Sequence, residues 1–319
     1  MKILANDGMS QSGINALTAA GHEVITTKVA QEQVANFLNE NSIEAIVVRS
    51  ATKVRADIID ACPNLKIIGR GGVGMDNIDV EYARDKGLHV INTPASSSES
   101  VAELVFAHLF TGVRFLHQAN REMPLEGDTQ FEKLKKAYAN GIELRGKTLG
   151  IIGMGRIGTA VARMGLGLGM RVIASGRAEK TVAVKVDFYN GQSIEVGITT
   201  QPLEEVLGQS DFLSIHVPAQ EGYLIGAEEF AMMKQGAGIV NCSRGGVVDE
   251  VALVEALESG KISFAGLDVF ENEPTPAIQI LMHPGISLTP HIGAATLEAQ
   301  DRIGTELAAQ IIALSQNLS

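Results

Sequence analysis

The fold is decided by a stretch at residues 147–158, which reads Lys-Thr-Leu-Gly-Ile-Ile-Gly-Met-Gly-Arg-Ile-Gly. An apolar, strand-like run leads directly into Gly-x-Gly-x-x-Gly, and a segment of helical period follows. The first glycine permits a tight turn, the second lets backbone approach a pyrophosphate, and the third lets the helix pack closely on the strand. The first helical amides can bind an anion. The stretch therefore predicts a dinucleotide-binding Rossmann unit, whose cofactor contacts are Gly153, Gly155, Arg156, Ile157 and Gly158.

The residues after the next predicted strand, Arg171–Ala174, bear on the choice between NAD and NADP. NAD enzymes normally place an acidic residue there for the ribose 2′-hydroxyl. This chain instead has Ser175, Gly176 and Arg177. No carboxylate would repel a 2′-phosphate, and Ser175 and Arg177, with Lys180 as a further candidate, could hold one. The sequence therefore favours NADP(H) slightly, and the alternative is that Arg177 is solvated and the enzyme uses NAD.

Two series of short apolar runs, separated by segments of helical period, organise the chain. The predicted strands of the first series are Lys2–Ala5, Glu23–Thr26, Ala45–Val48, Leu65–Ile68 and His89–Ile91, and those of the second are Thr148–Ile152, Arg171–Ala174, Phe212–His216, Gly238–Asn241 and Phe264–Leu267. This pattern predicts an α/β protein with two doubly wound parallel-sheet domains. Alternating runs on both sides of Asn190-Gly191 predict a hairpin over Val184–Ile198, and Leu297–Leu318 is expected to form a final helix.

Composition excludes several classes of protein. The chain has 319 residues, 45% of them hydrophobic, two cysteines and a net charge of −11. The cysteines are far apart and no His or Cys cluster has ligand spacing, so we expect a reducing cytoplasm and no metal. The negative charge disfavours nucleic acid. The N-terminus does not resemble a signal peptide. Charged residues interrupt the hydrophobic stretch Val101–Leu116, so no membrane role is expected.

Three charged or titratable residues each follow an apparent strand late in the second series. They are Arg244 in Asn-Cys-Ser-Arg-Gly-Gly, Glu273 in Asp-Val-Phe-Glu-Asn-Glu-Pro, and His291 in Leu-Thr-Pro-His-Ile-Gly. Ligands of open α/β sheets bind outside the carboxyl ends of the strands, where all three could converge. Each residue alone has an ordinary explanation as a packed or solvated side chain. Together, beside a dinucleotide fold, they indicate a catalytic site.

The chemistry of oxidising a secondary alcohol suits these three residue types. The hydroxyl proton must leave as hydride is removed, and an imidazole titrates in the useful range for accepting it. A carboxylate at Glu273 would orient the ring of His291 and raise its pKa. The planar fork of Arg244 suits bidentate contact with a carboxylate and can polarise a carbonyl.

Three sequence blocks, Asn-Cys-Ser-Arg-Gly-Gly, Gly-Leu-Asp-Val-Phe-Glu-x-Glu-Pro and Thr-Pro-His-Ile-Gly-Ala-Ala-Thr, resemble signatures of the D-2-hydroxyacid dehydrogenases. The resemblance implies that His291 is the acid/base, that Glu273 pairs with it, and that Arg244 holds the substrate carboxylate and carbonyl. Asp268 would contact the nicotinamide end, with a helix cap as its alternative. The remaining predicted cofactor contacts are His216, Val217 and Pro218.

Two blocks of the first series, Val48–Val54 and Gly69–Asp79, are similar to those of phosphoglycerate dehydrogenases within this family. The similarity implies backbone contacts from Val73 and Gly74 to the substrate carboxylate, and contacts from Arg49 and Arg70 to a phosphate, with Ser50 also at the substrate. Alternatively, Arg49 is a surface charge and Arg70 braces the glycine loop. The chain departs from the family at Ser96–Ser98, where an Asn is common, and a further basic residue could be Lys133, Lys135 or Lys136.

The resemblance also implies a domain division and an activity. Residues 1–95 and 287–319 would form a flavodoxin-like substrate domain, residues 96–286 the cofactor domain, with hinges near Pro94 and Pro290 and homodimerisation through the cofactor domain, including Val101–Leu116. No C-terminal regulatory domain is expected. The implied reaction is oxidation of D-3-phosphoglycerate to 3-phosphooxypyruvate with NAD(P) in L-serine synthesis. The alternatives are an NADPH-dependent glyoxylate or hydroxypyruvate reductase and, more remotely, a dinucleotide-sensing corepressor-like scaffold.

Overall fold

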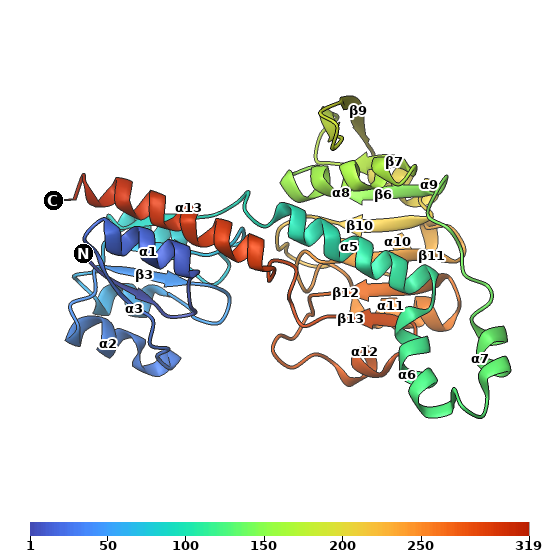
Figure 1. The fold of residues 1–319 in the computed structure, drawn as a ribbon, viewed down its shortest axis with the longest axis horizontal. Helices are drawn as coiled ribbons and strands as arrows, with labels where there is room; N and C mark the ends of the chain where they lie inside the picture. The colour runs from blue at the N-terminus through green and yellow to red at the C-terminus, as the bar shows by residue number, and fades with distance from the viewer. Residues whose placement is uncertain (319) are drawn as a thin grey trace. The chain divides into compact units, whose positions relative to one another are not determined.

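A computed structural model describes residues 1–318, which form two compact units. Unit 1 comprises Met1–Ser100 and the segment that begins at Ala294, and unit 2 comprises Val101–Gly293. Figure 1 shows the two ends of the chain, blue and red, together in unit 1. No helix within residues 1–318 is long and apolar enough to cross a membrane.

Unit 1 is built on a parallel sheet with the strand order β2-β1-β3-β4-β5, which is the flavodoxin-like order. Its strands are β1 (Lys2–Ala5), β2 (Glu23–Ile25), β3 (Ala45–Val48), β4 (Ile67–Arg70) and β5 (His89–Asn92). Its helices are α1 (Gln11–Ala19), α2 (Val34–Glu40, after the short η1, Gln31–Gln33), α3 (Ala56–Ala61), α4 (Val80–Asp85) and α13 (Leu297–Ser315). Both faces of the sheet are therefore covered, as the apolar strands require.

The final helix α13 packs beside α1 on one face of this sheet. The two helices approach closely at glycines, because a Cβ atom on Gly13 would lie only 2.6 Å from the carbonyl oxygen of Gly304. Helices α2, α3 and α4 bury their apolar residues against the opposite face. The last segment of the chain thus completes the core of the first unit.

Unit 2 contains an eight-stranded sheet with the order β13-β12-β11-β10-β6-β7-β9-β8. Its strands are β6 (Thr148–Ile152), β7 (Arg171–Ser175), β8 (Thr181–Asp187), β9 (Ser193–Gln201), β10 (Phe212–Ile215), β11 (Ala237–Asn241), β12 (Ile262–Leu267) and β13 (Ile286–Leu288). All neighbours are parallel except β8 and β9. The central strands follow the Rossmann order, so the predicted fold class is confirmed.

The helices of unit 2 cover both faces of its sheet. They are α5 (Ser98–Val113, which begins just before the unit boundary), α6 (Leu116–Glu126), α7 (Phe131–Ala137), α8 (Arg156–Gly167), α9 (Leu203–Gln209), α10 (Ala227–Met232), α11 (Glu250–Glu258) and α12 (Ile278–Met282). Residues of α5 and α8 share one apolar core, and residues of α9 to α12 share the other. The strands of this sheet therefore have an apolar core on each face.

The observed unit boundaries lie a few residues after the expected ones. The sequence placed the divisions at 95/96 and 286/287, whereas the units divide at 100/101 and 293/294. The second difference has a clear cause, because β13 pairs with β12 and holds residues 286–288 in the sheet of unit 2. A strand of three residues is too short to show a periodicity.

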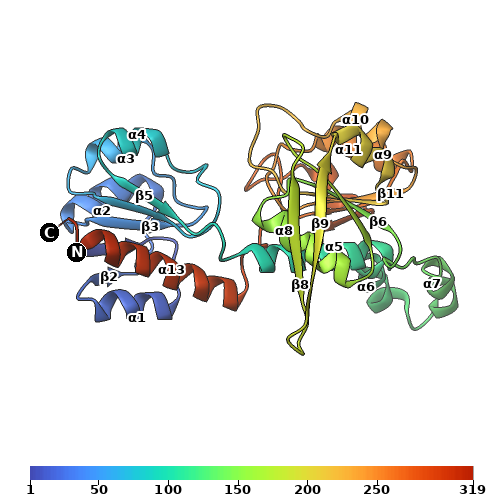
Figure 2. The same cartoon turned by 90° about the horizontal axis from the view of Figure 1, so that it is seen from above.

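The hairpin predicted around Asn190-Gly191 is present and longer than expected. Strands β8 and β9 pair from Thr181 with Thr199 to Asp187 with Ser193. Gly191 has φ of 82°, which a side chain would disfavour, and its amide donates to the carbonyl of Phe188. Figure 2 shows the far end of the two strands extending beyond the rest of the sheet.

Candidate active site

The glycine loop has the space that a dinucleotide needs. A Cβ atom on Gly153, whose φ is 96°, would lie 2.4 Å from the carbonyl oxygen of His216, and one on Gly158 would lie 2.0 Å from that of Gly153. The protein's own backbone therefore requires both glycines. Gly155, at the N-cap of α8, has no atom within 4 Å of the same position. Open space thus remains beside the helix N-terminus, where a pyrophosphate is stabilised in this fold.

Two further predicted cofactor segments lie next to this loop. The carbonyl of Ser175, at the end of β7, accepts from the amide of Gly153 at 2.9 Å, and a Cβ on Gly153 would also meet the side chain of Val217 at 3.3 Å. The ring of His216 hydrogen-bonds through Nε2 to Ser214, but its buried Nδ1 has no partner within residues 1–318. Burial lowers the pKa of His216 to about 3, so the ring is neutral at pH 7. The orphaned nitrogen and the open loop both fit a bound dinucleotide.

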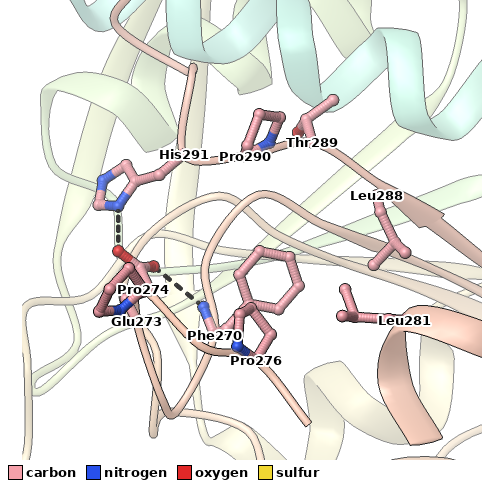
Figure 3. A pocket seen from close by; sticks show the side chains of 9 residues that line it. All are labelled: Phe270, Glu273, Pro274, Pro276, Leu281, Leu288, Thr289, Pro290 and His291. Carbon is pink, nitrogen blue, oxygen red and sulfur yellow. Dashed lines mark hydrogen bonds and ion pairs between the residues drawn. The ribbon is translucent and has the colours of Figure 1, made fainter. Parts of the chain in front are cut away.

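The predicted acid/base pair is formed in unit 2. Nδ1 of His291 lies 2.8 Å from Oε2 of Glu273, and the other carboxylate oxygen accepts from the amide of Phe270 at 3.1 Å (Figure 3). Burial favours the neutral acid, but hydrogen bonding to His291, the His291 charge and the charge of Arg244 outweigh it and lower the pKa of Glu273. Arg244 is therefore close enough to act on this carboxylate. The three residues singled out in the sequence lie together.

Asn241, the last residue of β11, shapes the turn that carries Arg244. Its side-chain amide donates to the carbonyl of Arg244 at 2.9 Å, and its Oδ1 accepts from the amide and hydroxyl of Ser243. A Cβ on Gly245 would lie 1.7 Å from the carbonyl oxygen of Phe270. The turn is thus pressed against the segment that leads to Glu273, which explains the glycine in the Asn-Cys-Ser-Arg-Gly-Gly block.

Asp268 holds the loop on which His291 lies. Its side chain is 1% exposed; Oδ1 accepts from the hydroxyl of Thr289 at 2.6 Å and from the amide of Ile292 at 2.8 Å, and Oδ2 accepts from the amide of Gly293 at 2.8 Å. These bonds support the left-handed backbone of His291, whose φ is 55°. Asp268 caps no helix within residues 1–318, so that alternative is wrong. A contact with the nicotinamide stays a prediction.

His108 is a supporting residue that the sequence analysis missed. It lies in α5, is buried, and hydrogen-bonds to the hydroxyls of Ser287 at 2.9 Å and Thr289 at 3.1 Å. Because Thr289 donates to Asp268, Nε2 of His108 must donate to Thr289. Burial lowers the pKa of His108 to about 4, which keeps the ring neutral. A histidine that is buried in an otherwise apolar helix requires a hydrogen-bonding partner. Its position in the apolar segment could therefore have marked His108 as a supporting residue.

A cavity of about 410 Å³ opens beside the His291 and Glu273 pair. Figure 3 shows the side chains around it, which are Phe270, Glu273, Pro274, Pro276, Leu281, Leu288, Thr289, Pro290 and His291. Most of these side chains are apolar, whereas the ring of His291 and the carboxylate of Glu273 are 37% and 36% exposed, so the pair remains accessible to a substrate and to water.

The predicted substrate residues after β3 line a second cavity, in unit 1. The cavity measures about 480 Å³, and Arg49 and Ser50 line it together with Asp7 and with Lys28, from the loop after β2. Asp7 fixes the Arg49 loop, since its carboxylate accepts from the amide of Arg49 at 2.7 Å and from the hydroxyl of Thr52 at 2.8 Å. Lys28 was missed; it lies three positions after the end of β2, whereas Arg49 comes directly after β3.

Arg70 is placed differently from Arg49. Its Nη1 donates to the carbonyl of Gly71 at 3.3 Å, and a Cβ on Gly72 would lie 1.6 Å from the same nitrogen. The guanidinium thus packs on its own glycine loop, as the alternative interpretation expected. Val73 is half-exposed, and its carbonyl accepts from the side chain of Asn92 at 2.8 Å. The amides of Val73 and Gly74 stay predicted substrate contacts.

No group of three or more His, Cys, Asp or Glu residues in the described chain, residues 1–318, is arranged to hold a metal ion. The two cysteines, Cys62 and Cys242, are both free and buried.

Comparison with known proteins identifies the family of the chain. A family model described as "D-isomer specific 2-hydroxyacid dehydrogenase, NAD binding domain" matches residues 106–293. The chain is 43% identical to hydroxypyruvate reductase of Thermotoga maritima, over 91% of this chain and 90% of that protein. It is 40% identical to D-3-phosphoglycerate dehydrogenase of Methanocaldococcus jannaschii, over 98% of this chain but only 57% of that relative's length.

A solved structure adds to this comparison. The NADPH-dependent glyoxylate/hydroxypyruvate reductase of Sinorhizobium meliloti superposes with a TM-score of 0.79 at 27% identity, covering 98% of this chain and 94% of that one. Sequence blocks, fold and site geometry agree with these matches: the chain belongs to the D-2-hydroxyacid dehydrogenase family and is an NAD(P)-binding oxidoreductase.

Proposed function

We propose that this protein is a D-3-phosphoglycerate dehydrogenase that interconverts D-3-phosphoglycerate and 3-phosphooxypyruvate in L-serine synthesis. The hydroxyacid chemistry rests on one observation, the 2.8 Å pair of His291 and Glu273 with Arg244 beside it. The phosphorylated substrate is supported by the cavity that Lys28 and Arg49 line. Two cations at one cavity suit a phosphate, which forms strong charge-assisted hydrogen bonds.

The residues of the site divide the chemistry between them. The glycine loop at residues 153–158 would hold a nicotinamide cofactor, which would supply the hydride acceptor for the carbon that carries the hydroxyl. Nδ1 of His291 is occupied by Glu273, so Nε2 takes the hydroxyl proton, and the ionised carboxylate stabilises the imidazolium that results. Arg244 binds the substrate carboxylate and polarises the carbonyl that forms. Asp268 keeps the His291 loop in place throughout.

Removing the two cations of the unit 1 cavity tests the phosphate assignment. We expect Lys28→Ala and Arg49→Ala to lower kcat/KM for D-3-phosphoglycerate by about tenfold or more each, since each loses a charge-assisted contact. Rates with hydroxypyruvate, which has no phosphate, should change little. Lys53→Ala is the matched control, because Lys53 is an exposed cation of the same loop that does not line the cavity. Equal losses for both substrates would reject the assignment.

The second candidate function is an NADPH-dependent glyoxylate or hydroxypyruvate reductase. Two observations favour it: the identity of 43% to a hydroxypyruvate reductase over nearly its whole length, and the loop Ser175-Gly176-Arg177, which has no carboxylate for a ribose 2′-hydroxyl. The same loop supports NADP(H) over NAD(H) in either function. The corepressor-like scaffold has less support, because a sensor does not need the paired His291 and Glu273.

Homodimerisation is part of the proposal. The apolar residues of α5 are mostly buried in the core of unit 2, and this explains why the helix is so hydrophobic. Six of the exposed apolar side chains lie on the end of α5 and on the segment that follows it; they are Phe110, Leu116, Met123, Leu125, Phe131 and Ile142. A patch of this kind is typical of an interface, and a second copy of this chain would cover it.

The cytoplasmic location also stays a prediction.

A further inference from the structure

We propose that Thr200, in the β8–β9 hairpin, is a positioning residue for cofactor choice. It holds the loop Gly176–Lys180 in the conformation in which that loop discriminates between a ribose 2′-phosphate and a 2′-hydroxyl. The inference rests on the proposed use of this loop at the adenosine ribose. It gives the hairpin, which the catalytic chemistry does not use, a specific role.

The base of the hairpin is an integral part of the cofactor-binding sheet. The end of β9 pairs with the end of β7, with Thr200 beside Ala174 and Gln201 beside Ser175. Val184 and Ile198 are buried in the core shared with α5 and α8, and β8 lies beside α8, whose N-terminus carries the glycine loop. The base is therefore fixed, while the far end extends into solvent (Figure 2).

Thr200 clamps the whole loop between β7 and β8. Its amide donates to the carbonyl of Lys180 at 3.0 Å, and its Oγ1 accepts from the amide of Lys180 at 2.9 Å. The same hydroxyl donates to the carbonyl of Ala178 at 2.8 Å. Thr200 is 5% exposed, so these bonds are protected from water. One buried residue thus holds the loop backbone at Ala178 and at Lys180.

The clamp also limits the start of the loop. A Cβ atom at Gly176 would lie 3.2 Å from Cγ2 of Thr200, which is a tight contact, so the loop passes directly over the threonine. Every side chain of the loop, in contrast, is exposed: Arg177 and Lys180 carry positive charge and Glu179 carries negative charge. The backbone is held, and its charged side chains are left facing solvent and ligand.

A fixed backbone matters here because the loop carries charges of both signs. A 2′-phosphate gains from Arg177 and Lys180 but is repelled by Glu179, so its affinity depends on which side chain the loop presents. Pre-ordering the loop removes the entropy cost of selecting that conformation when the ligand binds. Loss of the Thr200 hydroxyl should therefore weaken ligands that carry the 2′-phosphate more than ligands that lack it.

The test measures binding of 2′,5′-ADP and 5′-AMP to the apo protein by isothermal titration calorimetry. We expect Thr200→Val, which keeps the shape and removes the hydroxyl, to weaken 2′,5′-ADP by about tenfold and 5′-AMP by less than about twofold. Thr200→Ser restores the hydroxyl and should restore the affinity ratio. The matched control is Thr199→Val, which removes a hydroxyl bonded to Thr181 in the same hairpin but not to the loop.

The outcomes separate this inference from the proposed NADP(H) preference. The wild-type ratio and an Arg177→Ala variant test the preference alone: equal affinities that Arg177→Ala does not alter would reject it. The Thr200 inference is judged by whether Thr200→Val changes the ratio. A greater weakening of 2′,5′-ADP than of 5′-AMP supports it even if the wild type prefers 5′-AMP, and a change of the ratio in the opposite direction overturns it. An unchanged ratio, including equal weakening of both ligands, or the same change in Thr199→Val, overturns it.

Discussion

The buried His108 predicts a specific acid sensitivity of the folded protein. The unfolded chain takes up a proton at this residue near pH 6.5, whereas the folded chain does so only near pH 4. The folded state therefore binds fewer protons in this window, and its free energy of unfolding falls as the pH drops from about 6.5 to about 4. A shift of this size corresponds to about 3 kcal/mol lost by pH 4.

The variant His108→Gln isolates that contribution. Glutamine can bond one of the two hydroxyls but does not titrate. The free energy of unfolding of the variant should therefore be about 1 kcal/mol lower at pH 7, without the further decrease that His108 causes at acid pH. Because the chain has no tryptophan, urea unfolding at pH 7 and pH 4 is best followed by circular dichroism. The loss between the two pH values should be about 3 kcal/mol smaller in the variant. An equal loss in both proteins would refute the neutral, buried His108.

Three further predictions concern catalysis and assembly. We expect His291→Ala to lower kcat by at least about a hundredfold with unchanged binding of 5′-AMP, and full turnover in stopped-flow assays would reject the acid/base assignment. Asp268→Asn should lower kcat more than it raises KM, because the amide cannot accept all three loop hydrogen bonds; steady-state kinetics that show only a KM effect would contradict this. Leu125→Asp changes a side chain that is 80% exposed and should convert the dimer to a monomer, as measured by light scattering. The control is Leu297→Asp, at a residue of unit 1 that is 87% exposed, and this variant should remain dimeric.

Local motifs explain why much of the fold and the site could be predicted from the sequence. The glycine loop at residues 153–158 and the hairpin at Asn190-Gly191 are each encoded within a few neighbouring residues. Arg244, Glu273 and His291 could be grouped because the carboxyl ends of parallel strands meet at one edge of a sheet. These predictions depended on adjacency in the chain or on a general rule of topology.

The residues that sequence reasoning missed depend on contacts between distant segments. His108 bonds Ser287, which lies 179 positions away, and no local pattern encodes such a pair. The guanidinium of Arg70 packs on Gly71 and Gly72, which was one of two interpretations of its block, and its contact with a substrate phosphate stays a prediction. The clamp by Thr200 arises because a hairpin returns to the loop that precedes it. Such contacts follow from packing, which composition and period do not determine.

The most direct test of the proposed function is a comparison of initial rates. D-3-phosphoglycerate oxidation and hydroxypyruvate reduction would each be measured with NAD(H) and with NADP(H), under otherwise identical conditions. We predict turnover of D-3-phosphoglycerate, faster with NADP⁺ than with NAD⁺. Turnover of hydroxypyruvate alone, with no oxidation of D-3-phosphoglycerate by either cofactor, would contradict the assignment and place the enzyme among the reductases.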